Sequence, residues 1–327
     1  MQAKYLVTGG GGFLGKALCL KLKELGHEVI SISRSDYPEL HAAGVATICH
    51  DISKPWDKIL EKLIAVNGVF HTASKVDMWG KYDDFYQTNF VGTKNVIDVC
   101  KKLTIKRLVY TSSPSVIADG SNTAGVDESY PYPSKYMAFY PATKALAERE
   151  VLNSNSTDLF TLALRPHLIW GPGDTHLVPM VLARARKNKL IRIGSGKNLV
   201  DTSFITDCVA AHINAMQALD TNSNARGRPY FISQCEPVRL WGWIDQILKL
   251  NNVALVSKSL PAGVAKLVAG ILETICNCLP NNPEPIFTRF LASQMSTDHY
   301  FNIDSAKREL GYKPEYSIEQ AMKVTFG

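Results

Sequence analysis

The sequence lacks the features that mark secreted, membrane-spanning or zinc-binding proteins. Its seven cysteines are scattered and odd in number, and no Cys-x-x-Cys pair occurs, so neither a disulfide framework nor a metal site is indicated. No window reaches about 18 uninterrupted apolar residues, the length that a bilayer-spanning helix needs. The first residues lack the charged, apolar and cleavage regions of a signal peptide. These absences favour a metal-free protein of the reducing cytoplasm.

The chain also has no long run of basic residues. Its formal net charge of +6 is modest for 327 residues, and lysine and arginine are spread along the chain. A mildly basic surface is therefore expected rather than a nucleic-acid interface, and the same surplus would suit an anionic small molecule. This length accommodates one large domain with a smaller part appended.

Short apolar runs alternate with helical patterns through the first half of the chain. The strands and then the main helices expected from these patterns lie at 5–8, 29–33, 46–49, 68–71, 107–112 and 160–165, and at 13–25, 83–102 and 141–153. Such alternation predicts an α/β protein with a doubly wound parallel sheet. The rhythm changes after Arg165-Pro166. We therefore expect a sheet domain over 1–166 and a smaller substrate-binding part over 167–327, with the chain crossing between them.

A glycine-rich run directly follows the first predicted strand and opens the first helix. Gly9, Gly10, Gly12 and Gly15 satisfy both Gly-x-Gly-x-x-Gly and Gly-x-x-Gly-x-x-Gly. Glycine permits the tight turn, and it lets the backbone approach a pyrophosphate. The N–H groups at the helix N-terminus then face the phosphates. Strand, turn and helix in this order predict a Rossmann-type dinucleotide site rather than a merely flexible turn.

The end of the second strand distinguishes the two nicotinamide dinucleotides. NAD sites place a carboxylate there for the ribose 2′-hydroxyl, whereas NADP sites use a nearby arginine for the 2′-phosphate. Here Ser33 stands in place of the carboxylate and Arg34 follows it, although Asp36 lies close enough to support NAD. We expect NADP(H) to be preferred, with NAD(H) as the alternative. A purely surface role for Arg34 is the competing interpretation.

A tyrosine and a lysine four residues apart form the candidate acid–base pair. Tyr140 and Lys144 share one face of a helix that begins near Pro141. Reduction of a carbonyl needs a proton for the developing alkoxide, and a free tyrosine has a pKa near 10. A neighbouring ammonium group lowers that pKa toward neutrality. The pattern alone is common in amphipathic helices, so its weight comes from context.

Further segments give that context. They include the Asn-x-x-Gly-Thr run and a Ser-Ser-Pro-Ser run after the fifth strand, and they lie at 89–95, 109–116, 164–166, 170–173, 298–301 and 310–314. With these motifs, the sequence resembles the extended short-chain dehydrogenase/reductases over essentially its whole length. Within them it is similar to the 3β-hydroxysteroid dehydrogenase-like branch, and most of all to the bacterial 2-alkyl-3-oxoalkanoate reductases of long-chain olefin biosynthesis.

The resemblance implies catalytic roles for three residues. Tyr140 would exchange the proton, and Lys144 would lower its pKa and bind the nicotinamide ribose. Ser113 would hydrogen-bond the substrate oxygen. Ser112 and Ser115 are the alternatives, because neighbouring strand residues face opposite sides and the register matters.

The resemblance also implies the residues that line the cofactor site. In chain order these are Gly9, Gly12, Phe13, Leu14, Gly15, Ser33, Arg34, Asp51, Ile52, Thr72, Ala73, Ser74, Tyr140, Lys144 and Pro166. Asp51 would contact the adenine, and 72–74 would form a turn against the cofactor. Asn89 is expected to organise backbone, and His71 to be structural. His167 is a candidate for lining the site.

These implications add up to an NADP(H)-dependent oxidoreductase that interconverts a ketone and a secondary alcohol on a large apolar substrate. Reduction of a 2-alkyl-3-oxo acid to the 3-hydroxy acid is the leading hypothesis. A 3β-hydroxysteroid or sterol dehydrogenase is the alternative, and a sugar-nucleotide epimerase is less favoured. A catalytically silent dinucleotide sensor is the alternative from another class. Family habit implies a homodimer through helices 83–102 and 141–153.

The segment 260–280 is unusually apolar for a small-molecule enzyme. Its polar residues Lys266, Gly270, Glu273 and Asn277 recur at helical spacing and form one narrow stripe. A plain core helix, a lid over an apolar pocket and a membrane-surface element are the three interpretations. We favour the lid, with Phe287 and Phe290 as further pocket walls, and keep contact with a membrane or an enzyme complex as an alternative.

Overall fold

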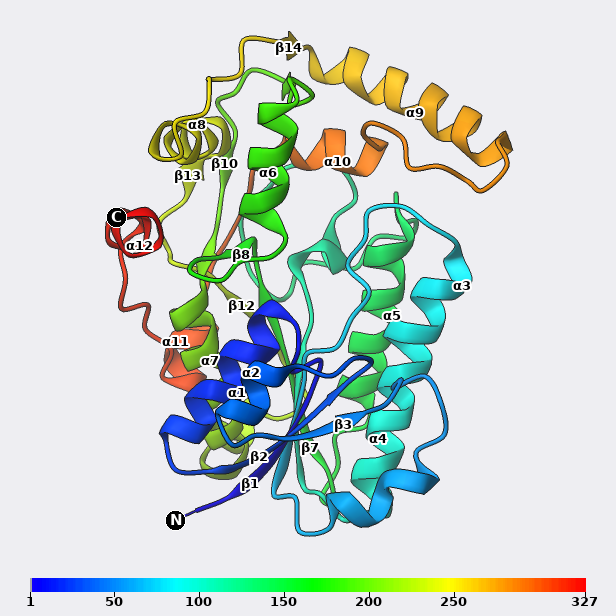
Figure 1. Cartoon of the computed structure of the whole chain (residues 1–327), viewed down its shortest axis with the longest axis vertical. Coiled ribbons are helices and arrows are strands. Elements are labelled where there is room, and N and C mark those ends of the chain that lie inside the picture. The colour runs from blue at the N-terminus through cyan, green and yellow to red at the C-terminus, as the bar shows by residue number, and fades with distance from the viewer. Residues whose placement is uncertain (1) are drawn as a thin grey trace.

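Seven parallel strands run through the centre of the computed structural model, which describes residues 2–327 (Figure 1). Their order across the sheet is β12, β7, β5, β4, β1, β2, β3, and every neighbouring pair is parallel. The strands are β1 (Lys4–Thr8), β2 (Glu28–Ser33), β3 (Ala46–Cys49), β4 (Gly68–His71), β5 (Arg107–Thr111), β7 (Phe160–Pro166) and β12 (Pro229–Ile232). The predicted doubly wound parallel sheet is confirmed.

Six of these strands are those expected from the first half of the chain, with ends that differ by at most one residue. The seventh, β12, was not predicted. It is only four residues long and begins with a proline, so its sequence carries little periodic signal. It pairs with β7 and forms one edge of the sheet.

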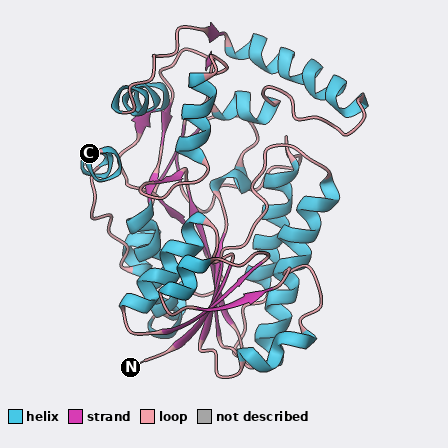
Figure 2. Cartoon of the chain, viewed as in Figure 1, coloured by secondary structure: helices cyan, strands magenta, loops and turns pink. Residues whose placement is uncertain are grey.

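Helices cover both faces of the sheet (Figure 2). On one face α1 (Phe13–Glu24) packs against α7 (Ile205–Thr221), with α11 (Asp304–Leu310) beside α7. On the other face α4 (Gly92–Lys102) packs against α5 (Phe139–Asn153). Because both faces are covered, the central strands are continuously apolar and fully buried, as Leu6 and Val69 illustrate.

The helix predicted over 83–102 is not regular. It consists of α3 (Tyr82–Phe85), a π-helix η2 (Tyr86–Val91) and α4. Such wide turns are uncommon and occur often at functional sites. The π-helix carries Asn89, which therefore occupies a position that an ideal α-helix would not give it.

A smaller part lies above the carboxyl edge of the main sheet (Figure 1). Its four-stranded sheet has the order β13 (Val238–Arg239), β10 (Leu199–Val200), β15 (His299–Phe301), β6 (Thr123–Val126). Two short parallel pairs are β8 (Ile169–Trp170) with β11 (Ser203–Phe204), and β9 (Arg192–Ile193) with β14 (Ser259–Leu260). Its helices are α6 (Leu177–Arg186), α8 (Leu240–Leu250), α9 (Ala262–Cys278), α10 (Arg289–Gln294) and α12 (Ile318–Phe326). Short elements elsewhere are α2 (Pro38–Ala42), η1 (Asp57–Leu63), η3 (Pro114–Ile117) and η4 (Ser223–Ala225).

The chain passes between the two parts several times. Strand β6 comes from the first half but joins the smaller sheet, whereas α7, β12 and α11 come from the second half and pack on or in the large sheet. The two parts are thus interleaved along the sequence, and a single boundary at residue 166 stays a prediction.

The apolar segment predicted over 260–280 forms α9, which packs on α10 near one end of the molecule (Figure 1). Only Ala265, Ala269 and Glu273 of this helix are buried, so it is not a plain core helix. Across residues 2–327, no helix combines the length and apolar character needed to cross a bilayer.

Candidate active site

The glycine run forms a tight turn between β1 and α1. Gly9 has a φ of 73°, and a Cβ atom there would lie 2.7 Å from the Ala73 backbone. A Cβ atom on Gly15 would lie 2.2 Å from the Gly9 carbonyl oxygen. Gly12 caps α1 without a side chain, and the first turn of the helix has no acid. The turn therefore offers backbone N–H groups to a pyrophosphate and fits a dinucleotide, with Phe13 and Leu14 opening the helix behind it.

The end of β2 shows how the two candidate specificity residues differ. The Ser33 hydroxyl accepts a hydrogen bond from the Gly11 backbone N–H at 2.9 Å, so Ser33 braces the glycine turn. Arg34 is exposed, and its positive charge adds a small effect to the hydrogen bonds from Ser53 that lower the pKa of Asp51. Asp36 pairs with His41 at 2.6 Å, and that hydrogen bond lowers the pKa of its carboxyl group. The Asp36 carboxylate is thus held by a protein partner while Arg34 is open to solvent.

The ends of β3 and β4 complete this side of the site. The Asp51 carboxylate accepts hydrogen bonds from the backbone N–H and hydroxyl of Ser53, and Ile52 is buried behind it. In the turn after β4, the Thr72 hydroxyl donates to the Thr8 carbonyl at 2.8 Å, and Ala73 touches the glycine loop. The parallel pairing of the strands places the ends of β1, β3 and β4 at one edge of the sheet.

Asn89 ties the loop after β4 to helix α5. Its Oδ1 accepts from the Lys75 backbone N–H at 2.7 Å and from the Ser74 hydroxyl at 3.0 Å. Its Nδ2 donates to the Lys75 carbonyl and to the Thr143 hydroxyl. The expectation that Asn89 organises backbone is confirmed, because its amide bonds both the N–H and the carbonyl of Lys75.

The candidate proton donor Tyr140 and the candidate serine Ser113 lie near each other. Tyr140 lies in the first turn of α5, and Ser113 caps η3 directly after β5. Burial raises the pKa of Tyr140, and a hydrogen bond with the Ser113 side chain lowers it in part. Ser112 lies instead beside Glu148, two turns further along α5. Ser113 therefore remains the candidate to share a substrate oxygen with Tyr140, and this role stays a prediction.

Lys144 points from α5 toward the end of β5. Its Nζ donates to the Thr111 carbonyl at 2.5 Å and lies 4.2 Å from the centre of the Tyr110 ring. Lys144 is only 2% exposed, and burial lowers the pKa of its ammonium group to about 7, although the Glu148 carboxylate raises it. Burial raises the pKa of Tyr140. The Ser113 hydroxyl, rather than the Lys144 ammonium, is the group that lowers this pKa in part.

A buried ion pair lies one helical turn below Lys144. Glu148 on α5 accepts two hydrogen bonds from Arg165 on β7, at 2.6 and 2.9 Å, and both side chains are almost completely buried. The Tyr132 hydroxyl donates to the same carboxylate at 2.5 Å. Sequence reasoning missed this role of Glu148 and Arg165. The spacing of four residues from Lys144 to Glu148 was the available signal, because it places both on one helix face.

Two candidate histidines have structural surroundings. His71 is fully buried, and its ring nitrogens bond the Thr8 and Thr93 hydroxyls at 2.6 and 2.9 Å; burial lowers its pKa to about 3. The structural role expected for His71 is confirmed. His167 follows Pro166 at the end of β7, and its Nε2 lies 2.6 Å from Nδ1 of His299. His299 was not predicted, since 132 residues separate the two rings in sequence.

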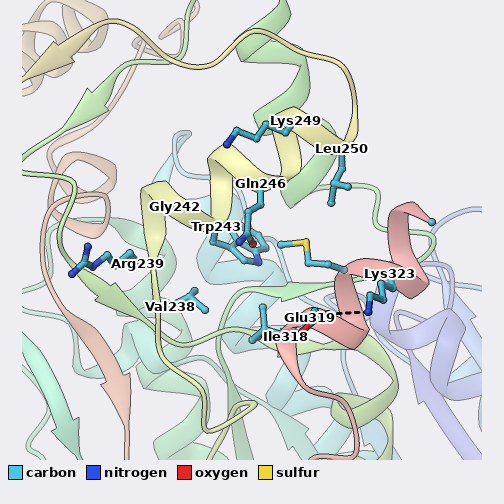
Figure 3. A pocket seen from close by; sticks show the side chains of 12 residues that line it. Val238, Arg239, Gly242, Trp243, Gln246, Lys249, Leu250, Ile318, Glu319 and Lys323 are labelled. Atoms are coloured by element: carbon cyan, nitrogen blue, oxygen red, sulfur yellow. Dashed lines mark ion pairs between the residues drawn. The ribbon is translucent and has the colours of Figure 1, made fainter.

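All the predicted site residues lie at the carboxyl edge of the large sheet, where the two parts of the molecule meet (Figure 1). A surface groove of about 830 Å³ lies elsewhere, between α8 and α12, and Figure 3 shows its lining. It is lined by Trp243, Met322 and the ion pair of Glu319 with Lys323, and by none of the predicted catalytic residues. That groove is therefore separate from the candidate active site.

Comparison with known proteins now adds to the geometry. Residues 6–262 match the 3-beta hydroxysteroid dehydrogenase/isomerase family. The chain belongs to this family. It is 43% identical to a 2-alkyl-3-oxoalkanoate reductase of Stenotrophomonas maltophilia, over 98% of this chain and 97% of that protein. It is 42% identical to a 2-alkyl-3-oxoalkanoate reductase of Shewanella oneidensis, over 97% of this chain and 84% of that protein. A human sterol-4-alpha-carboxylate 3-dehydrogenase (decarboxylating) is 35% identical, over 98% and 86%.

Solved structures confirm the fold. The structure of gox2253 matches with a TM-score of 0.78 at 24% identity, over 99% of this chain and 97% of that one. MoeE5 in complex with UDP-glucose and NAD matches with a TM-score of 0.75 at 19% identity, over 99% and 97%. At such identities the likeness shows the fold alone. Together with the family, it confirms an NAD(P)-dependent oxidoreductase of the extended short-chain dehydrogenase/reductase type.

Proposed function

We propose that this oxidoreductase uses NADPH to reduce a 2-alkyl-3-oxo acid with long alkyl chains to the 3-hydroxy acid. The observation that carries the proposal is the likeness of 42–43%, over nearly the whole chain, to two proteins named for that reduction. The proximity of Ser113 to Tyr140 supports it, because two hydroxyl groups that lie close together could contact one carbonyl oxygen.

In the proposed reaction, NADPH held by the glycine turn, Arg34 and Lys144 would supply the hydride that reduces the carbonyl carbon of the substrate. Ser113 donates a hydrogen bond to the carbonyl oxygen and stabilises the charge that develops on it. Tyr140 then gives its phenolic proton to the same oxygen. Lys144 would stabilise the resulting phenolate only once cofactor and substrate are bound, and it would hold the ribose hydroxyls, while Asn89 keeps α5 and the loop after β4 in register.

A sterol substrate is the second candidate, and the 35% identity to the human sterol dehydrogenase favours it. Both names describe a molecule with a carboxylate on the carbon next to the one that is oxidised or reduced. We propose that the substrate class is therefore a carboxylic acid whose ketone or hydroxyl group lies on the carbon β to the carboxylate.

The test is steady oxidation of NADPH with three substrates: a 2-alkyl-3-oxo acid, the ketone left after its decarboxylation, and a 3-oxo sterol. The proposal expects the acid to have the highest kcat/KM. Preference for the sterol would favour the second candidate, and equal rates with acid and ketone would show that the carboxylate is not recognised. Absence of turnover with all three, despite NADPH binding, would favour a dinucleotide sensor.

We also propose that Arg34 binds the 2′-phosphate and makes NADPH the preferred cofactor. The exposed guanidinium at the end of β2 supports this, as does the engagement of Asp36 by His41. The remaining residues proposed from the sequence to line the cofactor site, including Asp51 for the adenine and Pro166, lie along the same sheet edge.

A homodimer through α4 and α5 is the proposed assembly. Helices α4 and α5 lie side by side on one face, and the exposed rings of Tyr82 at the start of α3 and Phe139 at the start of α5 pack edge to face, with centroids 5.5 Å apart. Sedimentation equilibrium should give twice the mass of the 327-residue chain. A monomer at all concentrations would contradict this assembly.

A further inference from the structure

Helix α9 exposes an apolar stripe to solvent. The stripe consists of four side chains that are 46–67% exposed and recur at spacings of 3, 4 and 4, so they share one face of the helix. They are Val264, Leu267, Ile271 and Ile275. The opposite face carries Ala265 and Ala269, which are completely buried against α10. Within residues 2–327 nothing covers the stripe, although it is contiguous and apolar enough to mark an interaction surface.

Cationic side chains lie beside the stripe and near the start of α9. The pairing of β9 with β14 joins residues 184–192 to the start of α9, and the Lys258 ammonium donates to the Asn188 carbonyl across this junction. Residues 184–192 and 258–289 together carry eight cationic and only two acidic side chains. These are Arg184, Arg186, Lys187, Lys189, Arg192, Lys258, Lys266 and Arg289, with Glu273 and Glu284. The eight cations exceed the two acids by six charges, which equals the net charge of +6 of the whole chain.

Most of these cations are not neutralised by the protein. Arg184, Arg192 and Arg289 pair with Glu284, Asp245 and Glu273. The other five have no ion pair in the part of the chain that the structure describes; they are Arg186, Lys187, Lys189, Lys258 and Lys266. Lys266 and Arg289 line the same shallow hollow as Leu267 and Ile271, so charge and apolar surface adjoin.

The sign of the charge selects the occupant. A two-fold dimer through α9 would place the same patch on both subunits, and its cationic rim would face itself. An anionic lipid surface has the opposite charge and an apolar layer directly beneath its headgroups. A helix with one apolar face and lysine or arginine at its sides lies in the plane of such an interface.

We propose that α9 docks the protein on the surface of an anionic lipid bilayer. Leu267, Ile271 and their neighbours enter the boundary between headgroups and acyl chains, and the unpaired lysines of 187–189 and 258–266 contact lipid phosphates. The inference goes beyond the proposed reaction, because docking depends on this surface and not on which substrate is reduced.

The test is co-sedimentation of the full chain with vesicles of phosphatidylcholine alone and of phosphatidylcholine mixed with phosphatidylglycerol. We expect binding to the anionic vesicles, weakened by salt because screening shortens the reach of the lysines to about 10 Å at 0.1 M ionic strength. The double variant Leu267→Glu/Ile271→Glu should lose at least about tenfold in vesicle affinity.

The matched control is Leu25→Glu/Val324→Glu, which places the same charges at leucine and valine side chains that are 48% and 54% exposed on other helices. It should bind vesicles as the wild type does, apart from a small effect of net charge. Both variants should keep the wild-type thermal unfolding and turnover of a short ketone, because the changed side chains are exposed.

Three outcomes would overturn the proposal. The first is equal binding to neutral and anionic vesicles, or no binding to either, at low salt. The second is an α9 variant that binds as tightly as the control variant. The third is a change in subunit stoichiometry caused by Leu267→Glu/Ile271→Glu alone, which would assign the stripe to a contact between copies of the chain.

Discussion

The carboxylate of Glu148 accepts two hydrogen bonds from the Arg165 guanidinium directly below the Lys144 ammonium. One helical turn separates Glu148 from Lys144, and burial removes both from water. The ion pair therefore joins α5 to β7 and at the same time places a negative charge near the lysine. Stability and acid–base chemistry are coupled at this point of the fold.

The variant Glu148→Gln should change both the stability of the fold and the pKa of Lys144. It leaves the buried Arg165 without its counter-charge, and breaking such a pair costs about 3–5 kcal/mol. It also removes the charge that raises the pKa of Lys144, so the limb of the pH–rate profile that reports loss of the lysine proton should move below pH 7. Urea unfolding and pH–rate profiles measure the two effects. The double variant Glu148→Leu/Arg165→Met should recover most of the stability. An unchanged pH profile in a folded Glu148→Gln enzyme would leave the pair with a structural role only.

Tyr140→Phe should lower kcat by at least about 100-fold and leave NADPH affinity nearly unchanged, because it removes only the proton-carrying oxygen. Lys144→Ala should reduce both kcat and NADPH affinity, since the lysine is assigned to catalysis and to ribose binding. Fluorescence titration and steady-state kinetics separate the two. Near-normal turnover in Tyr140→Phe would place the proton donor on another residue.

Arg34→Ala should remove most of the preference for NADPH over NADH. A hydrogen-bonded contact between a guanidinium and a phosphate contributes about 1.5–3 kcal/mol, which corresponds to roughly a tenfold to hundredfold change in the ratio of affinities. Parallel titrations of both cofactors give the ratio. Lys16→Ala, which removes a surface cation that pairs with Glu39 near the same turn, is the control. Tighter binding of NADH by the wild type would contradict the assignment.

Acid should destabilise the protein below pH 6.5. His71 is buried as the neutral ring with a pKa of about 3, against 6.5 when exposed, so the unfolded chain binds more protons between these values. The free energy of unfolding should therefore fall as the pH drops, by about 2–3 kcal/mol from His71 alone at pH 4.5. Urea unfolding at pH 7 and 4.5 measures the slope. His71→Asn should flatten it, and the exposed His176→Asn should not; equal slopes in all three proteins would be inconsistent with a buried neutral His71.

The lid interpretation of α9 stays a prediction, with one contact in its favour. The Trp79 indole, in the loop after β4, donates to the Asn282 carbonyl just beyond α9 at 3.1 Å. Val268→Asp/Leu272→Asp alters half-buried positions on the inner side of the helix and should raise KM for long-chain ketones much more than for short ones. Leu267→Asp/Ile271→Asp on the outer stripe is the control. Equal losses for both chain lengths, with a lower melting temperature, would assign the inner side to packing alone.

The sequence by itself determined the elements that depend on local pattern. Six strands, the glycine turn and the helix that carries Tyr140 and Lys144 were predictable. Each depends on a pattern within one continuous stretch of chain: apolar periodicity, the spacing of glycines, or the spacing of four residues between the tyrosine and the lysine. The family could also be predicted, since its motifs are short and contiguous.

Tertiary structure alone decided the relationships between distant residues. Arg165 meets Glu148, His167 meets His299, and β12 joins β7 only after the chain has folded, because each contact depends on how strands and helices are ordered in space. The neighbours of the candidate serines likewise depended on tertiary structure, which places Ser113 near Tyr140 and Ser112 near Glu148. The apolar residues of α9 could be counted in the sequence, but which of them remain in water depended on the small contact that α10 makes with one side of that helix.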